Sequence, residues 1–362
     1  MKILFVDLEM EWRGGQNQAL LLLKAVNARG DTAELVTVKG SALGKRAAAR
    51  RVKVHSVPRY ATRASAMLKI FKLTRNRAFD VVHANEAHAV TAAWLAGAHR
   101  EAAFIISRRV GYPLGKSRLA LDRYRAATRI VAISQWVVER LVESGAPQDK
   151  IEVVYEGVEL PTLPTDEIRQ RARRRWKIPK EATLLGSVGV LSPDKGHELL
   201  IRALAQLRTE FPACRLLLAG DGPSRLQLEA LAKELGVAEM VIFAGFVTDI
   251  DLVYQALDVF LFPSFFEGLG TSLLAAMSYE VPAVAFQCCA FGEIIENEKS
   301  GLLVEQGNVG EIAQAVTRLL RDKEFARSIG QGGRARIADK FSSTRMVAEM
   351  SEVYWRVCSP PE

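Results

Sequence analysis

Residues 259–277 have the sequence VFLFPSFFEGLGTSLLAAM, in which an apolar segment, a glycine-containing turn and a helical pattern follow one another. The segment Val259–Phe262 has the length and composition of a buried strand. Gly268 and Gly270 permit close backbone approach, and a helix that begins after them leaves its first amides free to bind an anion such as a diphosphate. The alternative is a plain strand-to-helix turn in which Glu267 is a favourable N-terminal charge.

Short apolar segments alternate with longer amphipathic segments on both sides of this stretch. Segments of about four to six residues that are rich in β-branched side chains predict buried strands, and the amphipathic segments between them predict helices. Such alternation is typical of parallel sheets with helices on both faces. The expected strands are Ile3–Asp7, Glu34–Val38, Val81–Ala84, Ala103–Ser107, Ile130–Ala132, Thr183–Val188, Arg215–Ala219, Val241–Phe243, Val259–Phe262 and Ala283–Phe286.

The alternation is interrupted at residues 156–164, EGVELPTLP, which contain one Gly and two Pro and show no periodicity. This composition indicates a linker. We therefore expect an α/β protein with two Rossmann-like, doubly wound domains, residues 1–162 and 163–342, which face each other across a ligand-binding cleft. The last helical segment, residues 344–357, cannot be assigned to either domain from its pattern.

Two further strand-to-helix turns contain residues suited to phosphate. The segment GVLSPDKG at 189–196 places Lys195 at the start of a helix, where its ammonium group can neutralise a leaving diphosphate, although an exposed loop lysine has the same pattern. The segment AGDGP at 219–223 is rich in glycine but lacks the full dinucleotide fingerprint, so it is a weak signal. Gly14 and Gly15, after the first strand, fit a phosphate-facing turn and a simple tight turn equally well.

Composition limits the classes of function. The 362 residues suffice for two domains, and no apolar run approaches the ~18 residues that span a bilayer. The cysteines at 214, 288, 289 and 358 have no metal-ligand spacing, and the adjacent pair is poorly placed for a disulfide, which favours a reducing cytoplasm. The histidines at 55, 83, 88, 99 and 197 form no HExxH motif, so we expect no metal site.

Positive charge is concentrated in the first domain. Residues 1–160 carry 26 basic and 15 acidic side chains, and the stretch from Leu35 to Phe79 has twelve basic residues and no acidic one. Such a field attracts phosphates or an anionic membrane, although it also fits a solvated surface that only aids solubility. Within Arg63–Arg77, apolar and basic residues alternate as in a helix that rests on an anionic membrane, or as in an ordinary surface helix.

The motifs together resemble glycosyltransferase family 4, a group of retaining enzymes with the GT-B fold that use nucleotide sugars. The similar segments cover nearly the whole chain. They are WRGGQ near the start, DVVHAN at 80–85, EGV at 156–158, GVLSPDKG, LLLAGDGP, IFAGFVTDI, EGLGTSLLAAM and SGLLVEQG. The resemblance implies that a final helix, residues 343–362, packs back on the N-terminal domain, which would bind the acceptor while the C-terminal domain binds the donor.

The resemblance also assigns roles to residues. Lys195 would hold the donor diphosphate, Glu267 would contact donor-sugar hydroxyls, and His83 would lie near the reacting sugar, so these three are the expected catalytic residues. Asn85, Arg108 and Arg109 are expected at the acceptor site. The expected donor-binding residues are Gly14, Gly15, Gly189, Lys195, Asp221, Gly222, Phe246, Val247, Glu267, Gly268, Leu269, Gly270, Thr271 and Ser272.

Three positions depart from the family pattern. Ala275 stands where the second of a pair of glutamates would hold the nucleotide ribose, and Val190 stands where an arginine usually accompanies the lysine. The turn Gly-Gly-x-Pro-Glu is replaced by Cys-Ala-Phe-Gly-Glu at 289–293. A missing buried, charge-assisted hydrogen bond costs roughly 1.5–3 kcal/mol, so donor affinity would be lower without necessarily being abolished.

The resemblance predicts a retaining, metal-independent hexosyltransferase with no cofactor. Its donor would be a UDP- or GDP-linked sugar and its acceptor a glycan or lipid-linked molecule of the bacterial cell envelope, as in lipopolysaccharide synthesis. We expect a cytoplasmic protein that contacts the inner face of the membrane. The alternative is a non-catalytic protein of the same fold that binds sugar nucleotides or glycans, motivated by Ala275 and Val190.

Other classes fit less well. The basic N-terminal half has no recognisable nucleic-acid-binding motif, so no nucleic-acid partner is expected. A nicotinamide-dependent dehydrogenase would need a GxGxxG motif after a strand, which is missing. Asp249 and Asp251 spell the metal-binding signature DxD, but Thr248 and Asp249 have the pattern of helix-capping residues, which is a commoner use.

Overall fold

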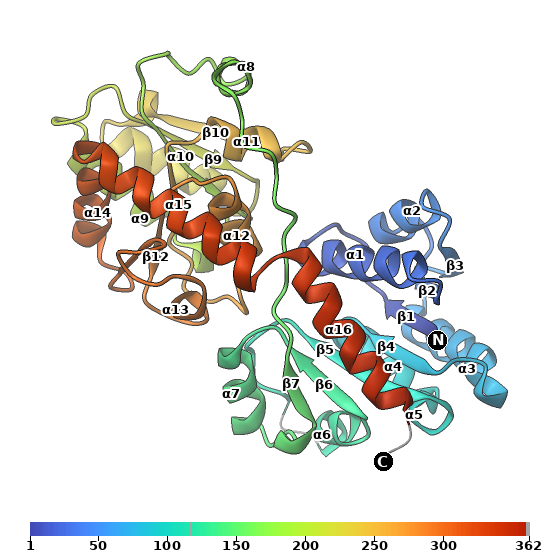
Figure 1. Ribbon diagram of the computed structural model, residues 1–362. Helices are drawn as coiled ribbons and strands as arrows, with labels where there is room; N and C mark the ends of the chain where they lie inside the picture. The colour runs from blue at the N-terminus through green and yellow to red at the C-terminus, as the bar shows by residue number, and fades with distance from the viewer. Residues whose placement is uncertain (116–117, 360–362) are drawn as a thin grey trace. The chain divides into compact units, whose positions relative to one another are not determined.

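The computed structural model describes residues 1–115 and 118–359. The chain forms two units, and each is a parallel sheet covered by helices (Figure 1). The first unit comprises Met1–Gly157 together with α16 (Ser343–Cys358), and the second comprises Val158–Ser342. The division falls earlier than the expected 162/163 boundary because the Val158 amide donates to the Phe341 carbonyl, at 2.9 Å, within the second unit.

The sheet of the first unit has seven parallel strands in the order β3-β2-β1-β4-β5-β6-β7. The strands are β1 (Lys2–Asp7), β2 (Thr32–Val38), β3 (Lys53–Val57), β4 (Val81–Ala84), β5 (Ala103–Arg108), β6 (Arg129–Ala132) and β7 (Ile151–Val153). The helices are α1 (Gly14–Ala28), α2 (Ala42–Ala48), α3 (Thr62–Thr74), α4 (Ala87–Leu95), α5 (Ala98–Glu101), α6 (Arg118–Arg125) and α7 (Gln135–Glu143), with short 3-10 turns η1 (Arg75–Arg77) and η2 (Gln148–Lys150).

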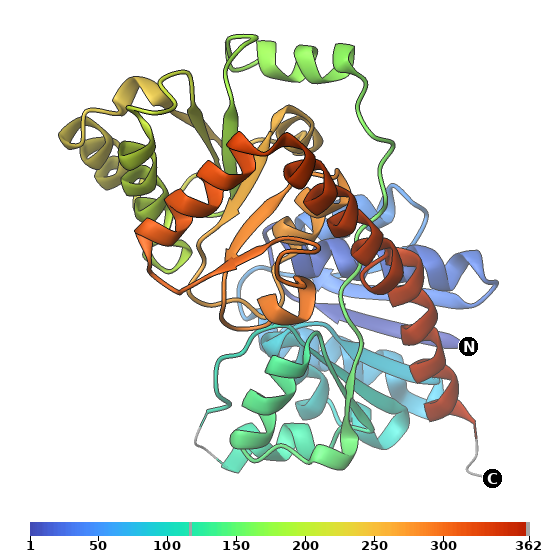
Figure 2. The ribbon, with the colours of Figure 1, turned by 60° about the vertical axis from the view of Figure 1, so that its left-hand side comes forward.

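The helix α16 contributes to the core of the first unit. Met346, Met350, Val353 and Tyr354 recur at helical spacing on one face and are buried in the cluster that also contains residues of β1 and α1. Both views show α16 beside α1 (Figures 1 and 2). The C-terminal segment thus packs in this unit from Ser343, and residues 360–362 of the expected helix lie outside the described residues.

The sheet of the second unit has six parallel strands in the order β10-β9-β8-β11-β12-β13. The strands are β8 (Leu184–Val188), β9 (Arg215–Ala219), β10 (Val241–Gly245), β11 (Val259–Phe262), β12 (Ala283–Phe286) and β13 (Leu302–Val304). The helices are α8 (Asp166–Arg174), α9 (His197–Leu207), α10 (Arg225–Glu234), α11 (Asp251–Ala256), α12 (Thr271–Ser278), α13 (Phe291–Ile294), α14 (Val309–Arg321) and α15 (Lys323–Lys340), with η3 (Pro193–Lys195) and η4 (Ala238–Met240).

In each unit the carboxyl ends of all strands meet at one edge of the sheet because every strand pair is parallel. In the first unit the turns after β1, β4 and β5 lie at this edge. In the second unit this edge carries the turns after β8, β9, β10, β11 and β12. The turns after β8, β9, β10 and β11 contain the residues expected to bind a donor, except Gly14 and Gly15, which lie in the first unit.

Candidate functional site

The turns after β8, β9 and β11 are held together by close backbone contacts in the second unit. The Phe265 amide donates to the Asp194 carbonyl at 2.9 Å. Gly220 has φ +147°, and a Cβ built on it would lie 1.8 Å from the carbonyl oxygen of Gly189. Gly222 is similarly close, since its Cβ would lie 2.5 Å from the Leu191 carbonyl oxygen. The glycines are therefore required for these turns to pack against one another.

Lys195 and Glu267 form an ion pair at this edge. Lys195 Nζ lies 2.6 Å from Glu267 Oε1 and 3.5 Å from Asp194 Oδ2, and the Lys195 and Glu267 side chains are 22% and 25% exposed. Burial by itself would lower the pKa of Lys195, but the charges and hydrogen bonds of Glu267 and Asp194 outweigh it and raise that pKa. Lys195 is therefore a stable cation at neutral pH, positioned by two carboxylates.

The segment that follows Glu267 ends at the N-terminus of α12. Gly270 has φ +107°, and a Cβ on it would lie 2.9 Å from a ring carbon of Phe262, so only glycine fits. Within the described residues, no partner is found for the amides of Thr271 and Ser272. Together with the positive end of the helix dipole, these amides can bind a negatively charged group. Gly268 and Leu269, which are both buried, connect this turn to Glu267.

The turns after β9 and β10 lie along the same edge. Asp221 is exposed, and its Oδ1 accepts a hydrogen bond from the Gly222 amide at 2.8 Å. Directly after β10, Phe246 is 76% exposed while Val247 is buried. An exposed aromatic ring at this position can stack on a planar group such as a nucleobase.

Two positions that depart from the family pattern are accessible to solvent. Ala275 is partly exposed on α12, and Val190 is 53% exposed in the turn after β8. A longer charged side chain at either position would not be forced into the core. The structure therefore offers no packing reason for their small or apolar side chains.

In the first unit, Asn85 connects the turns after β1 and β4. Its Nδ2 donates to Asp7 Oδ2 at 2.6 Å and to the Gly15 carbonyl at 3.3 Å, and the residue is 1% exposed. Burial raises the pKa of Asp7, while the hydrogen bonds from Asn85 and Gln16 oppose that rise. Asn85 thus fixes the glycine turn, and only its Oδ1 has no partner within the described residues. The glycine turn differs slightly from expectation, because α1 already begins at Gly14.

The two arginines after β5 have different roles. Arg109 Nε lies 3.2 Å from Glu156 Oε1, and a Cβ on Gly15 would lie 3.0 Å from Arg109 Cδ, so Gly15 makes room for this ion pair. Arg108 is only 8% exposed, and its guanidinium donates to the Tyr112 carbonyl and, at 3.4 Å, to the Tyr124 hydroxyl. The expectation that Arg108 contacts an acceptor does not fit this burial. Arg108 instead orders the chain that follows β5.

The catalytic role expected for His83 also needs correction. His83 is fully buried, and its Nδ1 and Nε2 lie 2.7 Å from the Tyr354 hydroxyl and the Ser107 hydroxyl respectively. Burial, followed by the charge of Arg109, lowers the pKa of His83 to about 3, so the ring is neutral. Because both ring nitrogens are occupied inside the unit, His83 has no atom to offer a substrate and has a structural role.

A hollow of about 390 Å³ lies beside the turn after β1, lined by residues 8–11, Arg13, Thr62, Arg63 and His88. Ligand atoms of Glu9, Glu86 and His88 lie within 4.8 Å of one another and could hold a metal ion. Two of these groups, His88 and Glu86, have other partners, however. Arg63 is hydrogen-bonded to His88 Nδ1 at 2.6 Å, and Glu86 caps α4 through the amides of His88 and Ala89.

The pKa of Glu86 makes the stability of the first unit depend on pH. Burial raises this pKa from 4.5 to about 7, with the charge of Asp7 adding to it. The folded state therefore holds a proton that the unfolded state releases between about pH 4.5 and 7, so Glu86 lowers stability as pH rises through that range. In Glu86→Gln we expect this fall, on the order of 1–3 kcal/mol, to disappear when urea unfolding is compared at pH 5 and pH 8. An unchanged pH dependence would contradict the raised pKa.

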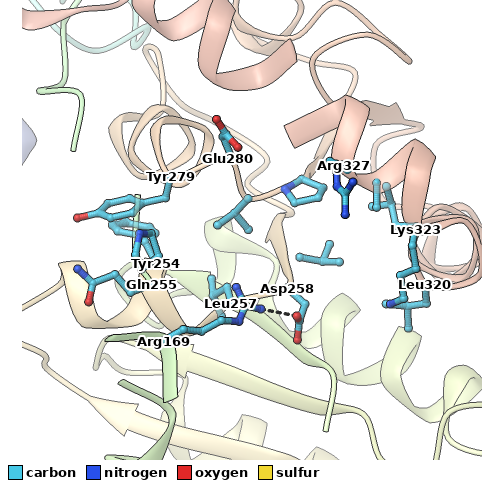
Figure 3. A pocket seen from close by; sticks show the side chains of 16 residues that line it. Arg169, Tyr254, Gln255, Leu257, Asp258, Tyr279, Glu280, Leu320, Lys323 and Arg327 are labelled. Atoms are coloured by element: carbon cyan, nitrogen blue, oxygen red, sulfur yellow. Dashed lines mark hydrogen bonds and ion pairs between the residues drawn. The ribbon is translucent and has the colours of Figure 1, made fainter. Parts of the chain in front are cut away.

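A second hollow, of about 410 Å³, lies at the amino ends of β11 and β12 in the second unit (Figure 3). Tyr254 and Tyr279 stack at one side, and Lys323 and Arg327 of α15 lie at the other. Arg169 pairs with Asp258 at its floor. The hollow is at the edge opposite to Lys195 and Glu267, so it is separate from the candidate donor site.

The DxD segment begins α11 without a side-chain cap. The helix starts at Asp251 after Ile250, and neither Thr248 nor Asp249 caps it, which corrects the expected capping role. Burial raises the pKa of Tyr279, and the neighbouring Asp251 charge and hydrogen bond add to this rise. Asp251 thus contacts a tyrosine of the core.

Comparison with known proteins agrees with this division of the chain. The family model described as Glycosyltransferase Family 4 matches residues 12–161, and the model described as Glycosyl transferases group 1 matches residues 168–336. EpsD of Bacillus subtilis is 34% identical over 54% of this chain and 50% of its own length. A GDP-mannose-dependent alpha-(1-6)-phosphatidylinositol monomannoside mannosyltransferase of Mycobacterium tuberculosis is 30% identical over 71% of this chain and 70% of its own length.

A solved structure of Anabaena HepE in complex with UDP-glucose superposes with a TM-score of 0.88. It covers 98% of this chain and 100% of the other at 21% identity, and it confirms the GT-B fold class for the two Rossmann-like units. The two family models and the mycobacterial relative together decide the family. The chain belongs to glycosyltransferase family 4.

Proposed function

We propose that the protein transfers a sugar from a nucleotide-sugar donor to a glycan or lipid-linked acceptor, with retention of configuration and without a metal ion. The observation that carries this proposal is the Lys195–Glu267 ion pair beside the free amides of α12. A cation and aligned amides at one edge suit the diphosphate of the donor, and a carboxylate next to them suits the sugar hydroxyls.

The chemistry requires charge stabilisation more than a protein base. The acceptor hydroxyl would attack the anomeric carbon on the face from which the nucleotide diphosphate leaves. The departing phosphate oxygen would take the hydroxyl proton. Lys195 and the amides of Thr271 and Ser272 would stabilise the negative charge that develops on the diphosphate, and preorganised donors of this kind are a large source of rate enhancement. The correction of His83 is consistent with a mechanism that needs no protein base.

The identities of the donor nucleotide and of the acceptor are proposed from what related proteins are named for. The mycobacterial relative is named for GDP-mannose, and the HepE structure contains UDP-glucose, so a GDP- or UDP-linked sugar is proposed here. The same relative acts, by its name, on a phosphatidylinositol monomannoside, which supports a lipid-linked acceptor of the cell envelope, of which the lipopolysaccharide type is one form. In the first unit, Arg109 is the residue proposed to face the acceptor, because its side chain is 15% exposed. Asn85, at 1% exposed, has the same positioning role as Arg108, which corrects the expected acceptor contact.

An anionic membrane is the proposed location of that acceptor. No helix in the described part of the chain is long and apolar enough to cross a membrane. On α3, Ile70 is buried against the unit while Leu68 and Phe71 are 55% and 47% exposed, among Lys69, Lys72 and Arg75. Exposed apolar side chains within a basic surface favour peripheral binding to anionic lipid from the cytoplasmic side.

We expect the protein to co-sediment with phosphatidylglycerol vesicles at low salt. The double variant Leu68→Ser/Phe71→Ser should bind these vesicles about tenfold more weakly, because it loses apolar contact with the lipid. Leu226→Ser, at a 78% exposed leucine of α10, is the matched control and should bind as the wild type does. Equal binding by the double variant and the wild type would contradict the role of α3.

The donor proposal is tested by binding of UDP, GDP, ADP and their sugar conjugates without divalent metal. One of them should raise the melting temperature. Ala275→Glu should tighten that binding about tenfold, because it would supply the carboxylate that the family pattern implies at the nucleotide ribose. Ala230→Glu, the same substitution at an exposed alanine of α10, is the matched control and should not tighten binding. No response to any nucleotide, with or without acceptor, would favour the non-catalytic alternative.

A further inference from the structure

Cys288 and Cys289 follow β12 at the edge of the sheet that carries Lys195 and Glu267. Both are free thiols and both are partly exposed. Cys289 has φ +50°, which is uncommon for a residue with a side chain. The pair occupies the turn in which the chain departs from the family pattern, and the proposed mechanism gives neither thiol a role.

The two sulfurs contact the segment that leads to Glu267. Cys288 Sγ lies 3.7 Å from the Ser264 carbonyl oxygen, and Cys289 Sγ lies 3.5 Å from the Phe265 carbonyl oxygen. The Cys289 sulfur also has two hydrogen-bonding neighbours, the Cys288 thiol and the backbone of Glu267. Any group added to Cys289 would therefore lie next to the residues proposed to hold the donor.

The surroundings favour the thiolate of Cys289. The hydrogen bond from Cys288, followed by the hydrogen bond from the Glu267 backbone and by the charge of Lys195, lowers the pKa of Cys289 against the opposing effects of burial and of the Glu267 charge. The other three thiols remain protonated. The Cys289 hydrogen bond and burial raise the pKa of Cys288, while burial raises the pKa of Cys214 to about 12 and also raises that of Cys358.

We propose that Cys289 is a modification site at the donor edge, where a hydroperoxide oxidises the sulfur and the product blocks donor binding. The Cys289 sulfur attacks one peroxide oxygen, so an S–O bond forms while the O–O bond breaks. The sulfur is oxidised to a sulfenic acid, the peroxide is reduced, and an alcohol or water leaves. The blocking effect rests on the proposed function, whereas the modification itself does not.

The second step involves a small thiol from solution and not Cys288. Adjacent residues joined by a trans peptide have Cα atoms about 3.8 Å apart, below the roughly 4.4–6.8 Å that a disulfide spans, and the described chain has no cis peptide. A low-molecular-weight thiol would attack the sulfenic sulfur, forming a mixed disulfide and releasing water. Its bulk would occupy the space beside Lys195 and Glu267.

The reactivity of the four thiols is tested in the wild-type protein with limiting N-ethylmaleimide at pH 7, followed by mass spectrometry of peptides. Because the pKa of Cys289 is lowered and that of Cys358 is raised, a larger fraction of Cys289 is thiolate at pH 7. Cys289 should therefore react at least about fivefold faster than Cys358, although a thiolate of lower pKa is the weaker nucleophile. Cys358 is the internal reference because it is exposed. In Cys288→Ser, Cys289 should still react first. Equal labelling of Cys358 and Cys289 in the wild type would overturn the proposal.

The blocking effect is tested with hydrogen peroxide and glutathione. Treated wild-type protein should lose binding of the stabilising nucleotide, while treated Cys289→Ser keeps it. Complete modification of Cys289 without loss of nucleotide binding would overturn the proposal. If untreated protein binds no nucleotide, the proposed function fails, and the order of thiol labelling still decides whether Cys289 is the modification site.

Discussion

Lys195→Ala should lower kcat by about 10²–10³-fold while the free energy of unfolding changes by less than about 1 kcal/mol. The rate falls because the ammonium group would stabilise charge that develops on the leaving diphosphate, and the loss of one such preorganised donor typically costs about 3–4 kcal/mol of activation energy. Stability changes little because both members of the Lys195–Glu267 pair are partly exposed. The measurements are steady-state kinetics with the stabilising nucleotide sugar and urea unfolding.

A loop lysine of the same unit provides the control for this prediction. Lys180 is exposed shortly before β8 and lies away from the carboxyl edge, so Lys180→Ala should retain wild-type kcat. Lys195→Arg separates charge from shape, since it keeps the cation but changes its hydrogen-bonding geometry, and it should recover only part of the lost rate. A kcat for Lys195→Ala within about threefold of wild type would refute the role of this lysine.

The alternation of apolar and amphipathic segments was sufficient to predict most of the fold. Ten strands expected from it are present, with ends that differ by a residue or two. The strands it did not predict are β3, β7 and β13, and each has a physical reason. β3 (Lys53–Val57) is an edge strand with polar residues, while β7 (Ile151–Val153) and β13 (Leu302–Val304) have three residues each and too little sequence to show a period.

The candidate site likewise contains residues that local sequence could place and residues that it could not. Lys195, Glu267 and Gly270 lie in turns between a strand and a helix, so local sequence already places them at the carboxyl edge of the sheet. His83 could not be understood locally, because its partner Tyr354 is 271 residues away in α16. Glu156 was expected in a linker, yet it is buried against Arg109. Only tertiary packing reveals that the strand-end polar residues of the first unit mostly bind one another.

Tyr354→Ala should destabilise the first unit by about 3–5 kcal/mol. Tyr354 is 1% exposed, its ring packs edge-on against Phe5 with centroids 6.3 Å apart, and its hydroxyl is hydrogen-bonded to His83 at 2.7 Å. The substitution would remove a large buried ring and leave the buried His83 Nδ1 without its partner, and both effects oppose folding. Because two units need not unfold together, hydrogen exchange of β1 and α1 amides should be followed in urea.

Two variants divide this effect into its parts. Tyr354→Phe keeps the ring and removes only the hydrogen bond, so it should cost about 1–3 kcal/mol. Trp355→Ala, at a neighbouring residue of α16 that is 67% exposed, should cost little. If Tyr354→Ala is no more destabilising than Trp355→Ala, the packing of α16 against β1 is wrong. Nucleotide binding should survive Tyr354→Ala below the unfolding transition, because Lys195, Glu267 and α12 belong to the other unit.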